Sequence, residues 1–224
     1  MINYNLTRSG RRTLGLYIRN GRVEVRAPLK LPKGEIDRFV EQKEAWILDK
    51  LSRSSEQAAK RDGFTVGYGS RLIIRGAEYP VAARDGGRAG FDGNCFYLPS
   101  GMAPEQIKEI CLKTYRLLAK RYLVEKTLDF ARRMSVKPAT VKVNSARSRW
   151  GSCSTKKNIN FSWRLIMAPD HVIDYVIVHE LVHLAVMNHS ARFWQIVEGI
   201  IPDYRERKKL LRELHRRLSA EDWD

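Results

Sequence analysis

The sequence predicts an α+β fold in two parts: a β-rich subdomain with one helix at residues 1–102, and a helix-rich domain at residues 103–224. In the first part, short runs that alternate apolar and polar residues are separated by glycine-containing turns, which is typical of strands. After Ser100-Gly101, longer stretches have helical periodicity instead. A chain of 224 residues can form one large or two small domains, so we expect a boundary at this change.

The β-rich part is expected to begin with a hairpin over residues 14–25. Apolar and polar residues alternate on both sides of Asn20-Gly21, a dipeptide that favours a tight two-residue turn. Residues 34–51 have the periodicity of one amphipathic helix, and the polar residues 52–62 predict a loop. Short strands are then expected at residues 71–75, 79–83 and 95–98.

The second part is expected to begin with a long helix. Pro104 suits a first helical turn, and the apolar pattern continues to about Arg133. The expected inner stripe consists of Ile107, Ile110, Cys111, Thr114, Leu118 and Tyr122. A strand at Val141 and Val143, a turn-like segment at 148–154 and a strand at 160–167 follow.

The next helix carries the run His179-Glu180-Leu181-Val182-His183, with Pro169 in its first turn. Histidines four residues apart on a helix lie about 6 Å apart on one face, which suits one Zn²⁺ ion, and the Glu180 carboxylate flanks that face. The helix is apolar on nearly all sides and should be buried. Its polar groups would cost several kcal/mol unless they are satisfied by a metal or, alternatively, by hydrogen bonds within the core.

His189 is the expected third ligand. If the helix continued, His189 would point about 240° away from His183, so the helix must end between them. Asn188 is the expected breaker, because asparagine tolerates the left-handed conformation. Ser190 should cap a new helix that ends before Pro202. His171 and His215 lack this spacing, and we expect structural roles for both.

Composition limits the partners and the compartment. The net charge of +16 favours polyanions, although most basic residues are expected on ordinary solvated helix faces, so only weak, nonspecific nucleic-acid association is predicted. Three scattered cysteines suggest reduced thiols in a cytoplasmic protein. Neither a signal peptide nor a membrane span is expected.

A set of three nitrogen ligands leaves zinc one open position for water. Zinc lowers the pKa of that water to roughly 7, and Glu180 could accept its proton and pass it to the leaving group. The nitrogen-rich set favours Zn²⁺, with Ni²⁺, Co²⁺, Mn²⁺ and Mg²⁺ as alternatives. Cys153 is not needed as a nucleophile, and we expect it to be a small buried residue.

Several motifs together resemble the YgjP-like metal-dependent hydrolases, a bacterial group classed as zinc metallopeptidases and related to SprT-type proteases. The motifs are Arg149-Trp150-Gly151-Ser152-Cys153, Trp163-Arg164-Leu165, the segment from Tyr175 to His183, Asn188-His189-Ser190 with Phe193-Trp194, and Pro202-Asp203-Tyr204. The resemblance implies a zincin-like catalytic domain, with the active-site helix under an antiparallel sheet, His179, His183 and His189 as ligands, and Glu180 as the base.

Sequence position and the resemblance also suggest Arg149, Arg164 and Tyr204 as groups that bind substrate or stabilise an oxyanion, although each could equally be a salt-bridge or packing residue. Three functions remain open. The first is a metallopeptidase whose edge strand, Asn160 to Leu165, binds an extended peptide or protein substrate. The second is a metal-dependent hydrolase of nucleoside triphosphates or other phosphoanhydrides at the same site, with arginines clamping the phosphates. The third is a nucleic-acid-binding protein with a structural metal.

Overall fold

The computed structural model describes residues 2–19 and 21–223, and its chain forms two compact units. Unit 1 is Met1–Phe64 with Ser219–Asp222, and unit 2 is Thr65–Leu218 with Trp223–Asp224. The expected mixture of helices with small sheets is confirmed. The division between units falls near residue 64 instead of residue 102, because the strands after residue 70 pack with the second part of the chain.

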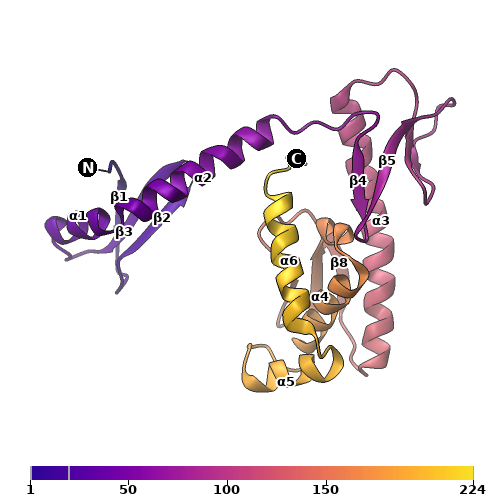
Figure 1. Cartoon of the computed structure of the whole chain (residues 1–224). Coiled ribbons are helices and arrows are strands. Elements are labelled where there is room, and N and C mark those ends of the chain that lie inside the picture. Colours follow the sequence, from indigo (N-terminus) through magenta and orange to yellow (C-terminus); the bar gives the residue numbers. More distant parts are fainter. Residues whose placement is uncertain (1, 20, 224) are drawn as a thin grey trace. The chain divides into compact units, whose positions relative to one another are not determined.

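Unit 1 is a three-stranded sheet with two helices (Figure 1). Its strands are β1 (Asn5–Ser9), β2 (Gly15–Arg19) and β3 (Arg22–Pro28), in the order β1-β3-β2. The β2–β3 pair is the expected antiparallel hairpin, and β1 runs parallel to β3. In the turn between β2 and β3, Gly21 has a φ of 70°, whereas Asn20 lies outside the described residues. Alternate residues of β3 are buried against α1 and α2: Val23, Val25, Ala27, Ile36, Val40 and Ile47 form this core.

The expected single helix at 34–51 is two helices, α1 (Lys33–Gln42) and α2 (Glu44–Asp62), which meet at Lys43. The expected loop at 52–62 is wrong, because α2 continues through it. That segment contains the run Glu56-Gln57-Ala58-Ala59-Lys60-Arg61, whose residue types favour a helix even where no apolar stripe is present. Almost all of it is exposed, so hydrophobic periodicity gave no signal.

The first strands of unit 2 form a four-stranded sheet, in the order β4-β5-β7-β6. Its members are β4 (Arg71–Ile74), β5 (Ala77–Ala83), β6 (Gly90–Phe91) and β7 (Phe96–Leu98). The long helix α3 (Pro104–Arg133) has the expected bounds. Its fully buried Tyr115 packs against Phe96, Trp163 and Trp223, and its hydroxyl donates to the Ile73 carbonyl at 2.9 Å. Tyr115 therefore joins these strands to the rest of unit 2.

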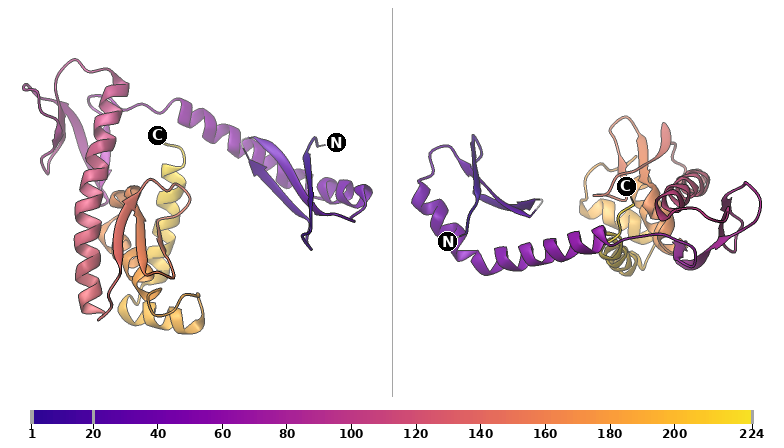
Figure 2. Two further views of the ribbon diagram at one scale, coloured as in Figure 1. Left: turned by 180° about the vertical axis from the view of Figure 1, so that it is seen from behind. Right: turned by 90° about the horizontal axis from the view of Figure 1, so that it is seen from above.

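A second sheet of unit 2 lies beside α3 (Figure 2, left). It contains β8 (Thr140–Asn144), β9 (Gly151–Cys153) and β10 (Asn158–Ser162), in the order β8-β10-β9. β10 runs parallel to β8 and antiparallel to β9, so the sheet is mixed and not purely antiparallel. The expected edge strand at Asn160 is wrong: β10 is central, and the chain then enters a 3₁₀ helix at Trp163–Met167. The outer strands of this sheet are β8 and β9.

The helix α4 (Asp170–Val182) packs against α3, β9, α5 (Ala191–Ile200) and α6 (Tyr204–Leu218) (Figure 1). It ends at Val182, six residues before the expected breaker, and Asn188 is not among the described residues with positive φ. Bonds from the Leu184 and Ala185 amides to carbonyls three residues earlier tighten the last turn instead. Ser190 takes the expected N-cap position of α5. Across the described ranges, no helix has the length and apolarity that a membrane crossing requires.

Asp170, in the first turn of α4, ties this helix to β4 and α3. Its carboxylate accepts hydrogen bonds from Arg75 Nε at 2.6 Å, from Arg75 Nη2, and from the Tyr122 hydroxyl at 2.6 Å. The Arg75 guanidinium also lies 4.6 Å from the centre of the Tyr122 ring. The hydrogen bond from Arg75 lowers the pKa of Asp170 to about 2.

Asp170→Asn should therefore lower the free energy of unfolding at neutral pH by about 1 kcal/mol, because solvent screens a side chain that is 39% exposed. The folded pKa lies below the unfolded value of about 3.9, so the wild-type advantage is complete above about pH 4 and is lost as pH falls through about 2. Urea denaturation across this pH range measures the difference. Asp129→Asn, at an exposed ion pair on α3, is the control; equal effects of the two changes would contradict the role of Asp170.

Candidate metal centre

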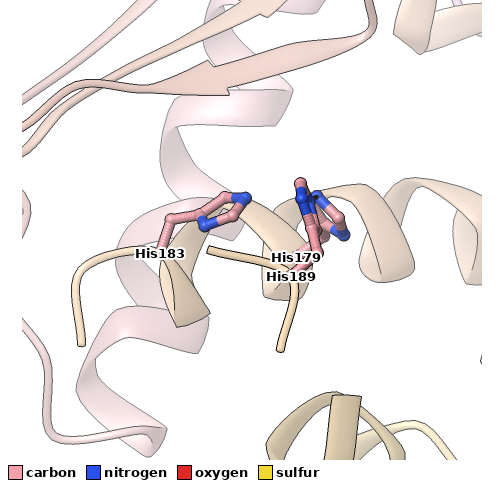
Figure 3. A group of neighbouring side chains, drawn as sticks. All are labelled: His179, His183 and His189. Carbon is pink, nitrogen blue, oxygen red and sulfur yellow. Dashed lines mark hydrogen bonds between the residues drawn. The ribbon is translucent and has the colours of Figure 1, made fainter. Parts of the chain in front are cut away.

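The three histidines predicted as ligands converge. His179 and His183 come from the last residues of α4 and its C-cap, and His189 comes from the connection to α5. One ring nitrogen from each lies within 4.8 Å of the others, and Nε2 of His179 lies 3.0 Å from Nε2 of His189. Figure 3 shows the three rings turned toward a common point. The early end of α4 makes this possible, since it lets the chain bring His189 back toward His179.

The ring nitrogens fit a divalent cation. Ligand nitrogens around a tetrahedral zinc at about 2.0–2.1 Å lie about 3.3 Å apart, close to the His179–His189 separation. His183 Nδ1 lies 3.0 Å from the Val186 carbonyl, which can only accept a hydrogen bond, so Nδ1 carries the proton and Nε2 keeps its lone pair. Burial, followed by the neighbouring His183 and His189, lowers the pKa of His179 to about 3, so its ring is neutral at pH 7. Neutral imidazoles are the form that binds metal.

Aromatic packing holds the rings in place. Phe193, at the start of α5, is fully buried, and its ring centre lies 4.9, 4.6 and 4.8 Å from those of His179, His183 and His189. Trp194 stacks on His189, with 5.7 Å between ring centres. Within the described chain, His179 Nδ1 has no hydrogen-bond partner, so packing fixes this ring. Packing against Phe193 and Trp194 therefore fixes the orientation of the imidazoles.

Glu180 directly follows His179 in α4, and its side chain lies against β9. Its side chain is buried, and burial raises its pKa to about 7, while the charge of Arg149 acts in the opposite direction. A Cβ atom on Gly151 would come within 2.6 Å of Glu180 Oε1, so β9 approaches the carboxyl group as closely as a glycine permits. A carboxyl group with a pKa near 7 can both take and return a proton at neutral pH.

Gly151→Ala should displace the Glu180 carboxyl group and lower kcat by about 10²-fold, because errors of about 1 Å at a reacting group have effects of this size. Metal content should not change, since the three atoms nearest to the added Cβ all belong to Glu180. Steady-state kinetics and metal analysis test this. Gly199→Ala is the matched control in α5, where an added Cβ meets nothing within 4 Å. A wild-type kcat for Gly151→Ala would show that β9 does not constrain the carboxyl group.

The other predicted site residues occupy different surroundings. Arg149 is close enough to lower the pKa of Glu180. Arg164 is buried, donates from Nη1 to the Ser145 carbonyl at 3.3 Å and lies over the Trp163 ring. Tyr204 is buried and stacks on Trp194, with 5.2 Å between ring centres. Of the three, Arg149 is thus the one that acts on the Glu180 carboxyl group.

The remaining titratable groups named from the sequence do not join the cluster. His171 is exposed in the first turn of α4, and His215 lies beside Trp150, with 6.0 Å between ring centres. Burial and the Glu180 charge raise the pKa of Cys153, which keeps the thiol protonated. His171 and His215 thus lie outside the histidine cluster, as expected, whereas Cys153 is half-buried and not fully buried as expected.

Sequence reasoning missed four contributors: Gly151, the Val186 carbonyl, Phe193 as a packing partner of the histidines, and Lys208. Gly151 belongs to the motif from Arg149 to Cys153, and Phe193 lies on the apolar face of α5. The sequence therefore marked both residues, but it did not show what they contact. The Lys208 ammonium lowers the pKa of both His179 and His189. It follows His189 by 19 residues and His179 by 29, on another helix, and no spacing rule connects them.

Comparison with known proteins finds a matching family model and a similar solved structure. The family model described as YgjP-like, metallopeptidase domain matches residues 12–214. Among solved structures, the crystal structure of the metallopeptidase zymogen of Pyrococcus abyssi abylysin is similar at 23% sequence identity, covering 44% of this chain and 97% of that chain, with a TM-score of 0.37. No curated protein matches the chain.

Proposed function

This chain belongs to the YgjP-like metallopeptidase family, and we propose from its site that it is a zinc-dependent metallopeptidase with Glu180 as the general base. The observation that carries the proposal is a buried carboxyl group with a raised pKa, that of Glu180, on the same helix as two of three converging imidazoles. Structural zinc sites normally use four side chains, whereas catalytic sites use three. The described cluster contains three.

When bound by His179, His183 and His189, a divalent cation would polarise the scissile carbonyl and make water more acidic. Glu180 would take a proton from the attacking water and deliver it to the leaving nitrogen. A raised pKa suits both halves of this transfer. Arg149 is the proposed donor to the developing oxyanion, because its positive charge already acts at Glu180.

For substrate binding, we propose strand addition at β9. The central strand β10 is paired on both sides, and β9 is an outer strand of the same sheet. β9 also contains Gly151, which lies directly against Glu180. An extended peptide that added to this edge would bring its carbonyl groups past the carboxyl group and the imidazoles.

The test is hydrolysis of denatured casein and of a nucleoside triphosphate panel by the same preparation, after metal analysis. We expect casein cleavage that a chelator abolishes and Zn²⁺ restores, with Ni²⁺, Co²⁺, Mn²⁺ and Mg²⁺ compared as replacements. Nucleotide hydrolysis without casein cleavage would overturn the peptidase proposal in favour of phosphoanhydride hydrolysis. Salt-dependent DNA binding without turnover of either substrate would favour a structural metal.

A further inference from the structure

A hollow of about 420 Å³ lies next to the metal centre, lined by Trp194, Tyr204, Arg205, Lys208 and Arg212. We call it the basic hollow. Trp194 connects it to the histidines, because one indole both lines the hollow and stacks on His189. Tyr204 continues the stack, tilted 17° from the Trp194 ring. The hollow is therefore separated from the proposed ligands by a single aromatic ring.

Three cations of α6 point into the basic hollow from one helix face, at positions 205, 208 and 212. The Lys208 ammonium lies 4.9 Å from the centre of the Trp194 ring, and the Arg205 guanidinium lies 4.9 Å from that of Tyr204. The aromatic rings thus hold two of the cations over the floor of the hollow.

The charges in the basic hollow are only partly neutralised. Arg205 pairs with Glu198 at 2.9 Å, but in the described part of the chain neither Lys208 nor Arg212 forms an ion pair. Outside the hollow, by contrast, Arg207 of the same helix pairs with Asp203 at 2.8 Å. Two uncompensated cations therefore remain beside the metal centre.

We propose that the basic hollow is a substrate subsite for an anionic oxygen group, a carboxylate or a phosphate, of the molecule hydrolysed at the histidine cluster. Hydrolysis of the bound molecule rests on the proposed function, whereas binding of its anionic group in the hollow does not. Arg212 can bind two oxygens of such a group side by side, and Lys208 adds a point charge. For a peptide, the group is an acidic side chain or the terminal carboxylate. The enzyme should then prefer acidic substrates.

The kinetic test uses full-length zinc-loaded protein and two forms of dephosphorylated casein. Succinylation converts the lysines to carboxylates, whereas reductive methylation keeps their positive charge. We expect the wild type to prefer succinylated casein, and Arg212→Gln to raise its KM about tenfold without changing kcat, since a hydrogen bond to a charged group contributes about this much. Lys209→Gln, an equal charge loss on α6 outside the hollow, should leave KM unchanged.

A binding test separates failure of this inference from failure of the peptidase proposal. Full-length Glu180→Gln protein is mixed with a labelled succinylated casein peptide, and its anisotropy is followed during competition by N-acetylglutamate and by pyrophosphate. Displacement by N-acetylglutamate identifies a carboxylate subsite, and displacement by pyrophosphate alone identifies a phosphate subsite. Both require that Arg212→Gln weakens the displaced complex. Equal effects of Arg212→Gln and Lys209→Gln, or no displacement by either competitor, would overturn the inference.

Discussion

Glu180→Gln should lower kcat by about 10³-fold, the effect typical of removing a general base, while the zinc content stays at the wild-type level. Glutamine has nearly the shape of glutamate, so the contact with Gly151 and the packing of α4 should persist. An amide cannot take a proton from water, and only the proton transfer is lost. Initial rates on casein, with metal analysis of the same sample, measure both quantities.

Glu206→Gln provides the matched control for this change. It removes an exposed carboxylate from α6, and it should leave kcat and metal content unchanged. If Glu180→Gln kept the wild-type kcat, Glu180 would not be the base, and another group would have to accept the proton.

His189→Ala should weaken zinc binding at least 100-fold and abolish hydrolysis at ordinary zinc concentrations. Loss of a direct ligand has a larger effect than the 10–100-fold typical of residues that only support the ligands. His189 is exposed on the connection between α4 and α5, so the change should leave the fold intact. Competition with a chromophoric zinc chelator gives the affinity, and circular dichroism checks the fold.

His171→Ala is the control for general effects of removing an imidazole. His171 is also exposed, but it lies in the first turn of α4, outside the histidine cluster. It should bind zinc as the wild type does. Equal zinc affinities for the two variants would mean that His189 is not a ligand.

Local patterns predicted the core of the site well. The spacing of His179 and His183 follows from helix geometry, and the need for a helix end before His189 follows from the same geometry. The structure brings these three residues together. The residue at which the helix ends was not predictable, because no residue with a strong helix-breaking tendency stands there. The helix ends in a tight turn that buries Val182 and directs the Val186 carbonyl to His183.

Long-range features could not be predicted from one sequence. The strand at residue 160 reads equally well as an edge or a central strand, and its partner β9 is only three residues long. In α3 only Ile107 and Cys111 of the expected stripe are buried. Tyr115, Ala119 and Leu123 are buried instead of Ile110, Thr114, Leu118 and Tyr122. The elements that pack on several sides of α3 decide which of its residues are buried, and the hydrophobic pattern of α3 alone does not show where those elements lie.

In the proposed site, three imidazoles hold one metal ion with a coordination position left free. X-ray absorption at the zinc edge of the zinc-loaded full chain tests it most directly. We expect three imidazole nitrogens and one further light atom that is exchangeable for solvent or an inhibitor, with one imidazole lost in His189→Ala. A closed shell of four protein donors, or an unchanged shell in His189→Ala, would contradict the claim.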